Sequence, residues 1–386
     1  MSNMAQHMSA ISPFHVMDIL ARAKQREEEG HDIIHMEVGE PDFSTPPNIV
    51  EAGIQALHRG YTRYTPATGL PALKQAISDY YQRRYRLEIN PQRIVITPGA
   101  SGALQLVLSV LLNRGDNVIL TDPGYPCNRN FVRLLGGESV PVAVTANGGF
   151  QPSLADLDAT LSQQPKALLL ASPANPTGSV LSVSQVQEYS RWSQQHAVSL
   201  IVDEIYQGLE FNAPSHTALA ADHEELFVIN SFSKYFGMTG WRLGWLVAPL
   251  AYVDALERLA QNLFLAAPTM AQYAALQAFS VETLALLDER CQQLKARRDY
   301  LIPALQSLGF GIPQSPQGAF YLYADCHRFT SDSLSFCQQL LTEVGVAITP
   351  GKDFGQHEAH THCRFAYTAP MDRLQEAVAR LSRVLG

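Results

Sequence analysis

The segment 230–245, NSFSKYFGMTGWRLGW, places a lysine, an arginine and several hydroxyls directly after the apolar run LFVI. A lysine in a partly apolar site has a lowered pKa, and its neutral amine is then a nucleophile toward carbonyl compounds. Lys234 is therefore a candidate nucleophile. Arg242 is suited to a fixed, two-pronged anion contact, and Ser231 and Ser233 bring hydroxyls close to it. Taken alone, the segment is also compatible with a strand end followed by a surface turn.

Other apolar runs end in polar residues too. SLIVDEIYQG ends its apolar part in Asp203, with Tyr206 three residues later. A carboxylate so close to a buried strand loses solvent, and it stays ionised only opposite a cation or a strong donor. IVIT runs into PGASGA, where the N–H groups of Ala100, Ser101 and Gly102 would open a helix and suit a phosphate.

The loop PANPTG, after the run ALLLAS, holds Asn175 between prolines, which favour a rigid turn. Each of these features also has an ordinary explanation. Asp203 is compatible with a helix cap or a core salt bridge, Ser101 with a capped glycine turn, and Asn175 with a plain turn. No single feature decides between a site and these explanations.

The elements that position these residues predict an α/β fold. Short runs rich in β-branched residues alternate with helix-like segments such as ALQLVLSVLL, which is typical of a mostly parallel sheet flanked by helices. In such sheets, ligands collect at the carboxyl ends of the strands. After about residue 280 the order of helix-like and strand-like segments changes and is typical of a smaller α+β unit. We predict a large domain over 46–285, and a small domain formed by 1–45, with its N-terminal arm, and 286–386.

Composition narrows the classes of partner. The chain has 386 residues, 46% of them hydrophobic, and a formal charge of -8, which disfavours nucleic acid and anionic membranes as partners. Its five cysteines show no CxxC spacing, which favours a reducing compartment. The start lacks the pattern of a secretory signal, and no apolar run reaches the roughly 20 residues that span a bilayer. These features predict a cytoplasmic protein.

The motifs together resemble one family across nearly the whole chain: the pyridoxal phosphate-dependent class I aminotransferases, in the aspartate aminotransferase superfamily of fold type I. The resemblance is carried, in order, by VGEPDF, YTRYTPATGLPALKQAI, PGASGAL, DPGYP, SPANPTG, VDEIY, SFSKYFGMTGWRLG, GAFY and CRFAY. It implies pyridoxal 5′-phosphate as the cofactor. It also implies a transfer of the amino group from an L-amino acid to a 2-oxo acid.

The resemblance implies a role for each matching residue. Lys234 would form the Schiff base with the cofactor and move the proton from the substrate Cα to the cofactor. Asp203 would pair with the pyridinium nitrogen, and Asn175 and Tyr206 with the ring phenolate oxygen. Tyr125 would stack on the pyridine ring. The phosphate would be bound by the following residues: Ala100, Ser101, Gly102, Ser231, Ser233 and Arg242.

The remaining implied contacts involve the substrate and a second subunit. Arg364 would grip the substrate α-carboxylate, and Gly39 would add a backbone contact on the same side. Tyr64 would reach the phosphate of the neighbouring subunit, which implies a homodimer with shared sites. The side-chain pocket would lie near Phe14 and the two residues after it. These residues are mostly apolar, and no lysine stands near Ser101, which together predict a neutral or aromatic donor.

Two alternatives to an aminotransferase remain open at this stage, and a degenerate, purely structural homologue is disfavoured because every residue with a chemical role is present. A C–S β-lyase on the same fold needs the same lysine, aspartate and arginine. A regulator that binds cofactor without turnover is disfavoured, because the stretch before VGEPDF is too short for a DNA-binding module. The histidines of GQHEAHTHC, with Cys363, fit no standard zinc spacing, so we interpret this segment as a polar loop and predict no metal.

Overall fold

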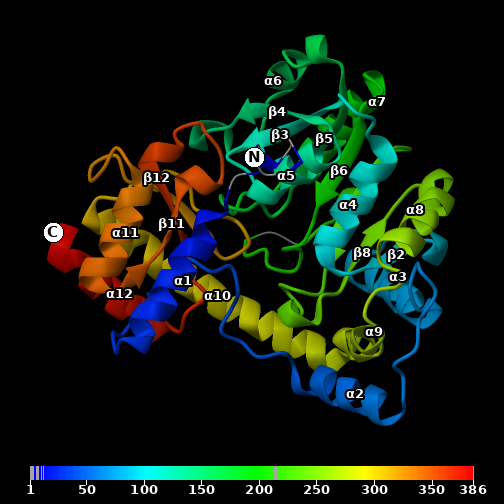
Figure 1. Cartoon of the computed structure of the whole chain (residues 1–386), viewed down its shortest axis with the longest axis horizontal. Helices are drawn as coiled ribbons and strands as arrows, with labels where there is room; N and C mark the ends of the chain where they lie inside the picture. Colours follow the sequence, from blue (N-terminus) through cyan, green and yellow to red (C-terminus); the bar gives the residue numbers. More distant parts are fainter. Residues whose placement is uncertain are drawn as a thin grey trace.

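The computed structural model describes residues 4–5, 8–9, 11, 13–212, 215–221 and 223–385. Its centre is a seven-stranded sheet in the order β2-β8-β7-β6-β5-β3-β4 (Figure 1). The strands are β2 (Ile94–Thr97), β3 (Asn117–Asp122), β4 (Glu138–Ala143), β5 (Pro165–Ala171), β6 (Ser199–Asp203), β7 (Leu226–Ser231) and β8 (Gly244–Val247). All neighbours pair in parallel except β8, which is antiparallel to both β2 and β7. The predicted α/β class with a mostly parallel sheet is confirmed.

The sheet is covered by helices on both faces, which explains why its strands are apolar without alternation. In β7, Phe227 and Ile229 belong to one hydrophobic core and Val228 to the other. The helices of this part are α2 (Pro47–His58), α3 (Pro71–Tyr85), α4 (Gly99–Leu111), α5 (Pro126–Leu134), α6 (Leu154–Asp158), α7 (Val183–Gln195), α8 (Leu250–Leu263) and α9 (Thr269–Ala275). Helix α4 packs on β7 and β8, so its first turn is held over the carboxyl end of the sheet.

A second group of elements lies beside the sheet. Its strands form an antiparallel sheet in the order β11-β12-β9 and a separate parallel pair, β1-β10. The strands are β1 (Ile34–His35), β9 (Tyr321–Asp325), β10 (Val346–Ala347), β11 (Thr349–Pro350) and β12 (His362–Ala366). The helices are α1 (His15–Glu28), α10 (Val281–Leu308), α11 (Ser333–Val344) and α12 (Met371–Leu385). The long helix α10 extends from this group toward α9 (Figure 1).

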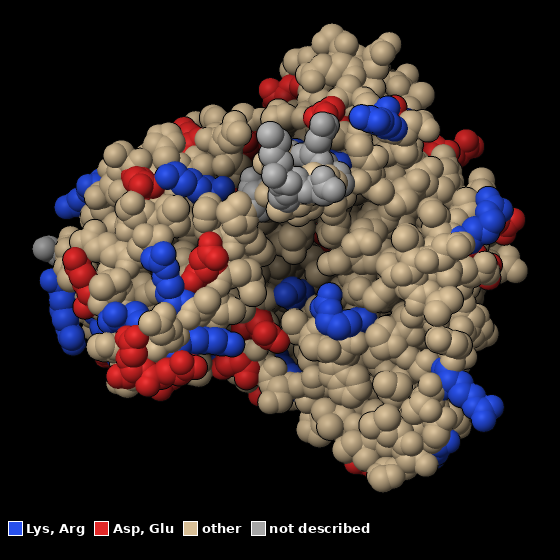
Figure 2. Space-filling view, in the orientation of Figure 1, with Lys and Arg blue, Asp and Glu red and all other residues tan. Residues whose placement is uncertain are grey.

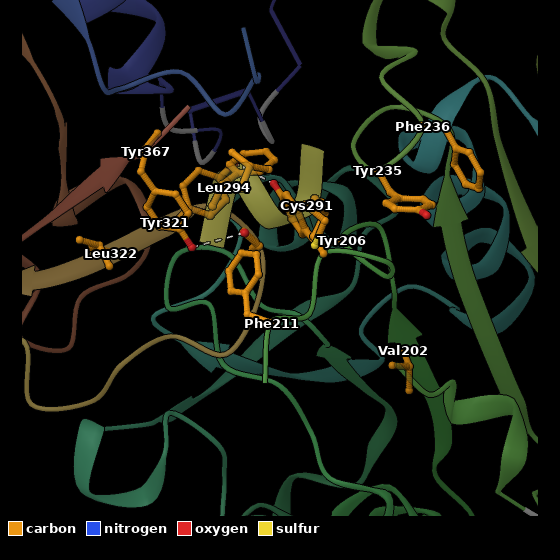
Figure 3. Packing of buried hydrophobic residues seen from close by; sticks show 14 of the residues in the cluster. Val202, Tyr206, Phe211, Tyr235, Phe236, Cys291, Leu294, Tyr321, Leu322 and Tyr367 are labelled. Carbon is orange, nitrogen blue, oxygen red and sulfur yellow. Dashed lines mark hydrogen bonds between the residues drawn. The ribbon is translucent and has the colours of Figure 1, made fainter. Parts of the chain in front are cut away.

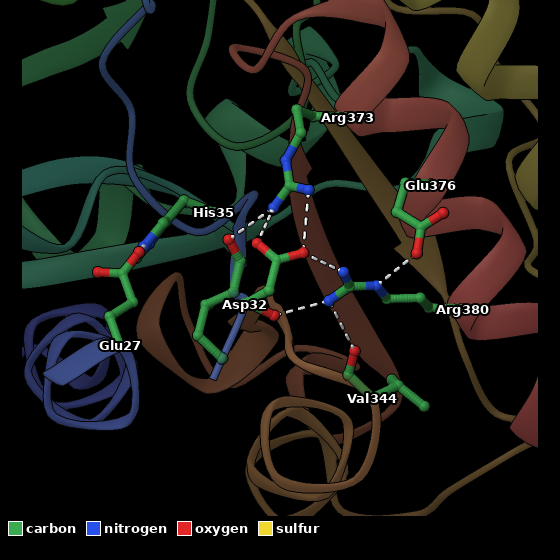
Figure 4. A network of polar contacts seen from close by, with 8 residues as sticks. Glu27, Asp32, His35, Val344, Arg373, Glu376 and Arg380 are labelled. Carbon is green, nitrogen blue, oxygen red and sulfur yellow. Dashed lines mark hydrogen bonds and ion pairs between the residues drawn. The ribbon is translucent and has the colours of Figure 1, made fainter. Parts of the chain in front are cut away.

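The N-terminal segment packs with this second group of elements. Asp32 pairs with Arg373 and Arg380 of α12, and Arg380 also pairs with Glu376 (Figure 4). These two arginines lower the pKa of Asp32 to about 2. The predicted domain boundary after residue 285 falls inside α10, and the division itself stays a prediction.

None of the helices in the described part of the chain has both the length and the apolar character needed to cross a bilayer.

Candidate active site

A cavity of about 270 Å³ lies at the carboxyl ends of the parallel strands, between the two groups of elements. The space-filling view shows a hollow there, with Lys and Arg atoms inside it (Figure 2). Most of the predicted site residues line this cavity: Phe14, Gly39, Ala100, Ser101, Tyr125, Asn175, Asp203, Tyr206, Ser233, Lys234, Arg242 and Arg364. Residues far apart in the sequence are therefore brought together because β2, β3, β5, β6 and β7 all end at the same edge.

Three predicted residues do not line the cavity. Gly102 lies in the first turn of α4. The Ser231 hydroxyl lies 2.9 Å from the Ser233 hydroxyl and accepts a hydrogen bond from the Ser233 amide, so it positions its neighbour. Tyr64 is 82% exposed. Its predicted contact with a second subunit involves a chain that the structure does not contain, so it stays a prediction.

Lys234 has the properties that the sequence predicted for a nucleophile. Burial lowers its pKa from the ordinary value of 10.5 to about 8, and the positive charges of Arg364 and Arg242 act in the same direction. The negative charge of Glu40 acts in the opposite direction. The Lys234 ammonium donates a 2.7 Å hydrogen bond to the carbonyl of Gly39. The neutral amine is thus more populated near neutral pH than that of a lysine with the ordinary pKa of 10.5.

Asp203 ends β6 and is 5% exposed. Its side chain accepts a hydrogen bond from the amide of Ile205 at 3.1 Å. Burial raises the pKa of Asp203 to about 6, and this hydrogen bond lowers it only in part. No ion pair of the described residues includes Asp203. A cationic group in the cavity would complete its environment.

The start of α4 forms a cradle for an anion. The first N–H groups of a helix have no partner within the helix, and Ala100 and Ser101 place theirs at the cavity. Gly99 has a φ of +73°, and a Cβ there would lie 2.8 Å from the Arg242 guanidinium. The guanidinium therefore lies against the helix N-terminus because Gly99 has no side chain. Ser233 adds a hydroxyl to this cradle.

Three tyrosines, Tyr125, Tyr206 and Tyr321, line the cavity. The hydroxyls of Tyr206 and Tyr321 lie 2.8 Å apart, and the two rings meet edge to face (Figure 3). A Cβ at Gly39 would lie 2.0 Å from the Tyr321 hydroxyl, so only glycine fits there. The ring of Tyr125 meets that of Phe14 edge to face, with 6.5 Å between centroids.

Arg364 is 2% exposed and is held from several sides. It donates to the side chain of Asn175 at 2.9 Å, to the hydroxyl of Thr349 at 3.2 Å and to the carbonyl of Glu37. Its guanidinium lies 4.2 Å from the ring centroid of Tyr321. The Arg364 Nε is buried without a hydrogen-bond partner, and no carboxylate of the described residues pairs with this arginine. A carboxylate in the cavity would accept a hydrogen bond from this Nε and neutralise the charge of the guanidinium.

Some lining residues were not predicted. Met17 and Leu20 of α1 line the cavity together with Val16, whereas His15 does not. Val16, Met17 and Leu20 are spaced in HVMDIL as on one side of a helix, and this spacing could have identified them as lining residues. Tyr321 and Tyr323 lie two residues apart on β9, so their side chains are on the same face of the strand, and of the two it is Tyr321 that lines the cavity.

The polar segment before Arg364 forms a turn against the large sheet. The amides of Gln356 and His357 donate to Asp122. The ring of His362 stacks on Tyr323, with 4.8 Å between centroids. Within the described ranges, no group of three or more His, Cys, Asp or Glu side chains is arranged to hold a metal ion.

The geometry fits pyridoxal phosphate on several independent points. The amine of Lys234 suits the aldehyde, the isolated carboxylate of Asp203 suits a pyridinium, and the α4 cradle with Arg242 suits a phosphate. Tyr125 adds an aromatic ring to the lining of the same cavity. The fold and this set of residues define a pyridoxal phosphate-dependent enzyme of fold type I.

Comparisons with known proteins agree. The family described as aminotransferase class I and II matches residues 31–381. The chain is 37% identical over 377 residues to a valine–pyruvate aminotransferase of Mycobacterium tuberculosis, covering 97% of this chain and 96% of that one. It is 34% identical to an aspartate aminotransferase of Bacillus sp. strain YM-2, covering 98% of each. A crystal structure of an aminotransferase from Mycobacterium tuberculosis superposes with a TM-score of 0.96 at 36% identity, covering 100% of this chain and 99% of the other.

The chain therefore belongs to the class I and II aminotransferases and is a pyridoxal phosphate-dependent aminotransferase.

Proposed function

We propose that this enzyme takes an amino group from a neutral or aromatic L-amino acid and passes it to a 2-oxo acid such as 2-oxoglutarate or pyruvate. The observation that carries the proposal is the apolar wall that the start of α1 gives to the cavity, formed by Phe14, Val16, Met17 and Leu20. An apolar side chain gains free energy when it leaves water against such a wall. A second carboxylate would lose its hydration there without gaining a partner.

The cations of the cavity support the same donor class. Among the described lining residues they are Lys234, Arg242 and Arg364. In the proposed arrangement these serve the cofactor aldehyde, the phosphate and the α-carboxylate, so no cation of this chain remains for a side-chain carboxylate. The relatives are named for valine and for aspartate. The apolar wall therefore supports the neutral donor more strongly than the names do.

Each residue has a specific task in the proposed reaction. When bound, pyridoxal phosphate supplies an electron sink for the charge that develops at the substrate Cα. Asp203 would hold a proton on the pyridine nitrogen, and Arg364 would hold the substrate carboxylate. Lys234 Nζ would remove the proton from Cα, because a base with a pKa of about 8 is effective near neutral pH.

A donor screen tests this proposal. We expect the catalytic efficiency, kcat/KM, for valine, leucine or phenylalanine to exceed that for aspartate and glutamate at least tenfold, with 2-oxoglutarate or pyruvate as acceptor. Reaction with aspartate and glutamate alone would overturn the proposal. Release of pyruvate and ammonia from cysteine or cystathionine without an acceptor would indicate a C–S β-lyase instead.

A homodimer with shared sites is part of the proposal. A groove of about 610 Å³ adjoins the cavity, because Glu40, Lys234 and Thr239 line both. Val50, Ile54 and Leu57 are exposed along it, and such an apolar surface suits burial against a second copy. Light scattering should give the mass of a dimer. Mixing Lys234→Ala with Tyr64→Ala chains should restore activity if Tyr64 acts in the partner's site, and no recovery would place Tyr64 elsewhere.

A cytoplasmic location is also proposed. The five cysteines are free thiols in the structure, which suits a reducing compartment. Fractionation of cells that express the protein would test the location, and recovery with the membrane or the exported fraction would contradict it.

A further inference from the structure

The start of helix α1 is capped by a carboxylate from the other end of the chain. The amides of His15 and Val16 each donate a 2.8 Å hydrogen bond to Asp353, one to each carboxylate oxygen. Phe14, the residue before the helix, provides no side-chain cap. Asp353 therefore satisfies two of the N–H groups that a helix start leaves without a partner.

We propose that Asp353 is a positioning residue that sets the apolar wall of the cavity and thereby contributes to the choice of amino donor. The inference rests on the proposed function and deepens it. The capped turn and the one after it carry the lining residues Val16, Met17 and Leu20. Val16 and Leu20 are four residues apart, so they lie on one face of α1. Fraying of the first turn would displace the wall that receives the donor side chain.

Asp353 is itself fixed in the protein. It is 1% exposed, and the Arg129 guanidinium of α5 donates to its backbone carbonyl at 2.8 Å. The next residue, Phe354, lies with its ring centroid 4.9 Å from the Arg364 guanidinium, and its carbonyl accepts from the amide of Gly124 at 2.8 Å. Asp353 thus holds α1 at a set position relative to both the proposed carboxylate site and the large sheet.

Asp353 is a buried carboxylate whose side-chain hydrogen bonds are both made with the start of α1. Burial raises its pKa, and the two amides act in the opposite direction. No Lys or Arg of the described residues forms an ion pair with it. A buried carboxylate without a cation destabilises a protein unless its hydrogen bonds compensate. The hydrogen bonds that compensate for the burial of Asp353 come from the first turn of α1, the helix that carries Val16, Met17 and Leu20. This arrangement is the one that a positioning residue requires.

The test compares donors that differ only in side-chain size, using the holoenzyme. Asp353→Ala removes both acceptors, and Asp353→Asn keeps one of them and the size of the side chain. We expect the ratio of kcat/KM for valine to that for alanine to fall about tenfold in Asp353→Ala, and less in Asp353→Asn, as for a lost helix cap. Because alanine scarcely reaches the wall, its kcat/KM should stay within about twofold. Ser182→Ala, which removes the cap of α7, is the matched control and should leave the ratio unchanged.

Amide hydrogen exchange gives a second readout that does not require turnover. Exchange over residues 15–20 should accelerate in Asp353→Ala and stay at the wild-type rate in Ser182→Ala. An equal loss of efficiency with alanine and valine, or unchanged exchange, would overturn the positioning role. A wild-type enzyme that used only aspartate and glutamate would overturn the proposed function and this inference with it. An unchanged ratio in an enzyme that does use valine would overturn this inference alone.

Discussion

The cofactor side and the substrate side of the cavity are built in different ways. Asp203 ends β6, Ser233 and Lys234 follow the neighbouring strand β7, and the anion cradle opens the helix after β2. The substrate side instead combines α1, the turn at Asp353 and the strand that carries Arg364. These segments are more than 330 residues apart at the extremes, and hydrogen bonds between them set their positions.

The residues proposed to hold the cofactor and those proposed to select the donor side chain therefore lie on different parts of the fold. A sheet buried on both faces fixes the cofactor groups within a core that tolerates little change. The wall of α1 is partly exposed, with Met17 at 55%, and it can change without disturbing the sheet. We therefore expect substitutions on the cofactor side to abolish turnover, and substitutions on the substrate side to change which donors are used.

The largest effect is expected for Lys234→Ala. Without the amine, transamination should fall at least about 10⁴-fold, because both the attachment of the cofactor and the proton transfer depend on it. The α4 cradle should still bind the phosphate of pyridoxal phosphate, so binding and turnover should be measured separately. Turnover near the wild-type rate would refute the role assigned to Lys234.

Arg364→Ala should have the next largest effect. Loss of this buried guanidinium should reduce kcat/KM, mainly through a higher KM. The corresponding loss of transition-state stabilisation is about 3–5 kcal/mol. Arg373→Ala is a suitable control. Arg373 lies on α12, pairs with Asp32 and does not line the cavity. Steady-state kinetics with unchanged efficiency in Arg364→Ala would move the carboxylate site elsewhere.

A gain of function would sharpen the comparison. Met17→Arg places a cation at the mouth of the cavity, where partial exposure limits its desolvation. We expect kcat/KM for aspartate to rise about tenfold, or about 1.4 kcal/mol, while that for valine falls. Leu263→Arg, at an exposed position on α8, should leave the donor preference unchanged. Equal changes for both donors in Met17→Arg would show that this wall does not select the side chain.

The smallest effect concerns stability and pH on the substrate side. His35 contacts the buried Glu37 at 2.7 Å and Glu27 of α1 at 3.2 Å, and the hydrogen bond to Glu37 is the main reason why its pKa rises to about 9 (Figure 4 shows His35 and Glu27). A raised histidine pKa stabilises the fold fully below the unfolded value of 6.5, and this contribution is lost as pH rises toward 9. After allowance for partial exposure, we expect about 1 kcal/mol.

Thermal unfolding of wild type and His35→Gln, both loaded with cofactor, would measure this contribution. The wild-type midpoint should fall more steeply than that of the variant between pH 6.5 and pH 9. Parallel curves would contradict the role of His35.

The sequence predicted which residues of the proposed cofactor side meet, because several of them lie at the ends of recognisable strands. Asp203, Lys234 and Ala100 are each adjacent to an apolar run, and the carboxyl ends of parallel strands meet at one edge. Strand β8 was not foreseen. It runs antiparallel to β7 after the segment 232–243, and a connection of that length does not by itself fix the direction of the next strand.

The substrate side was harder to predict because tertiary contacts define it. The apolar character of Phe14 and Val16 indicated a pocket, but the cap that Asp353 provides lies outside any local pattern. Tyr321 was part of a quoted motif without an assigned role, since its partner Tyr206 lies 115 positions away. Periodicity identifies which face of an element is buried, and it does not identify what that face meets.

The central claim is that Lys234 carries the cofactor, and covalent trapping tests it most directly. The holoenzyme would be reduced with borohydride and digested, and the peptides would be mapped by mass spectrometry. We expect the mass of the reduced cofactor on the peptide that contains Lys234. Attachment to another lysine, or no attachment in a protein that has bound pyridoxal phosphate, would contradict it.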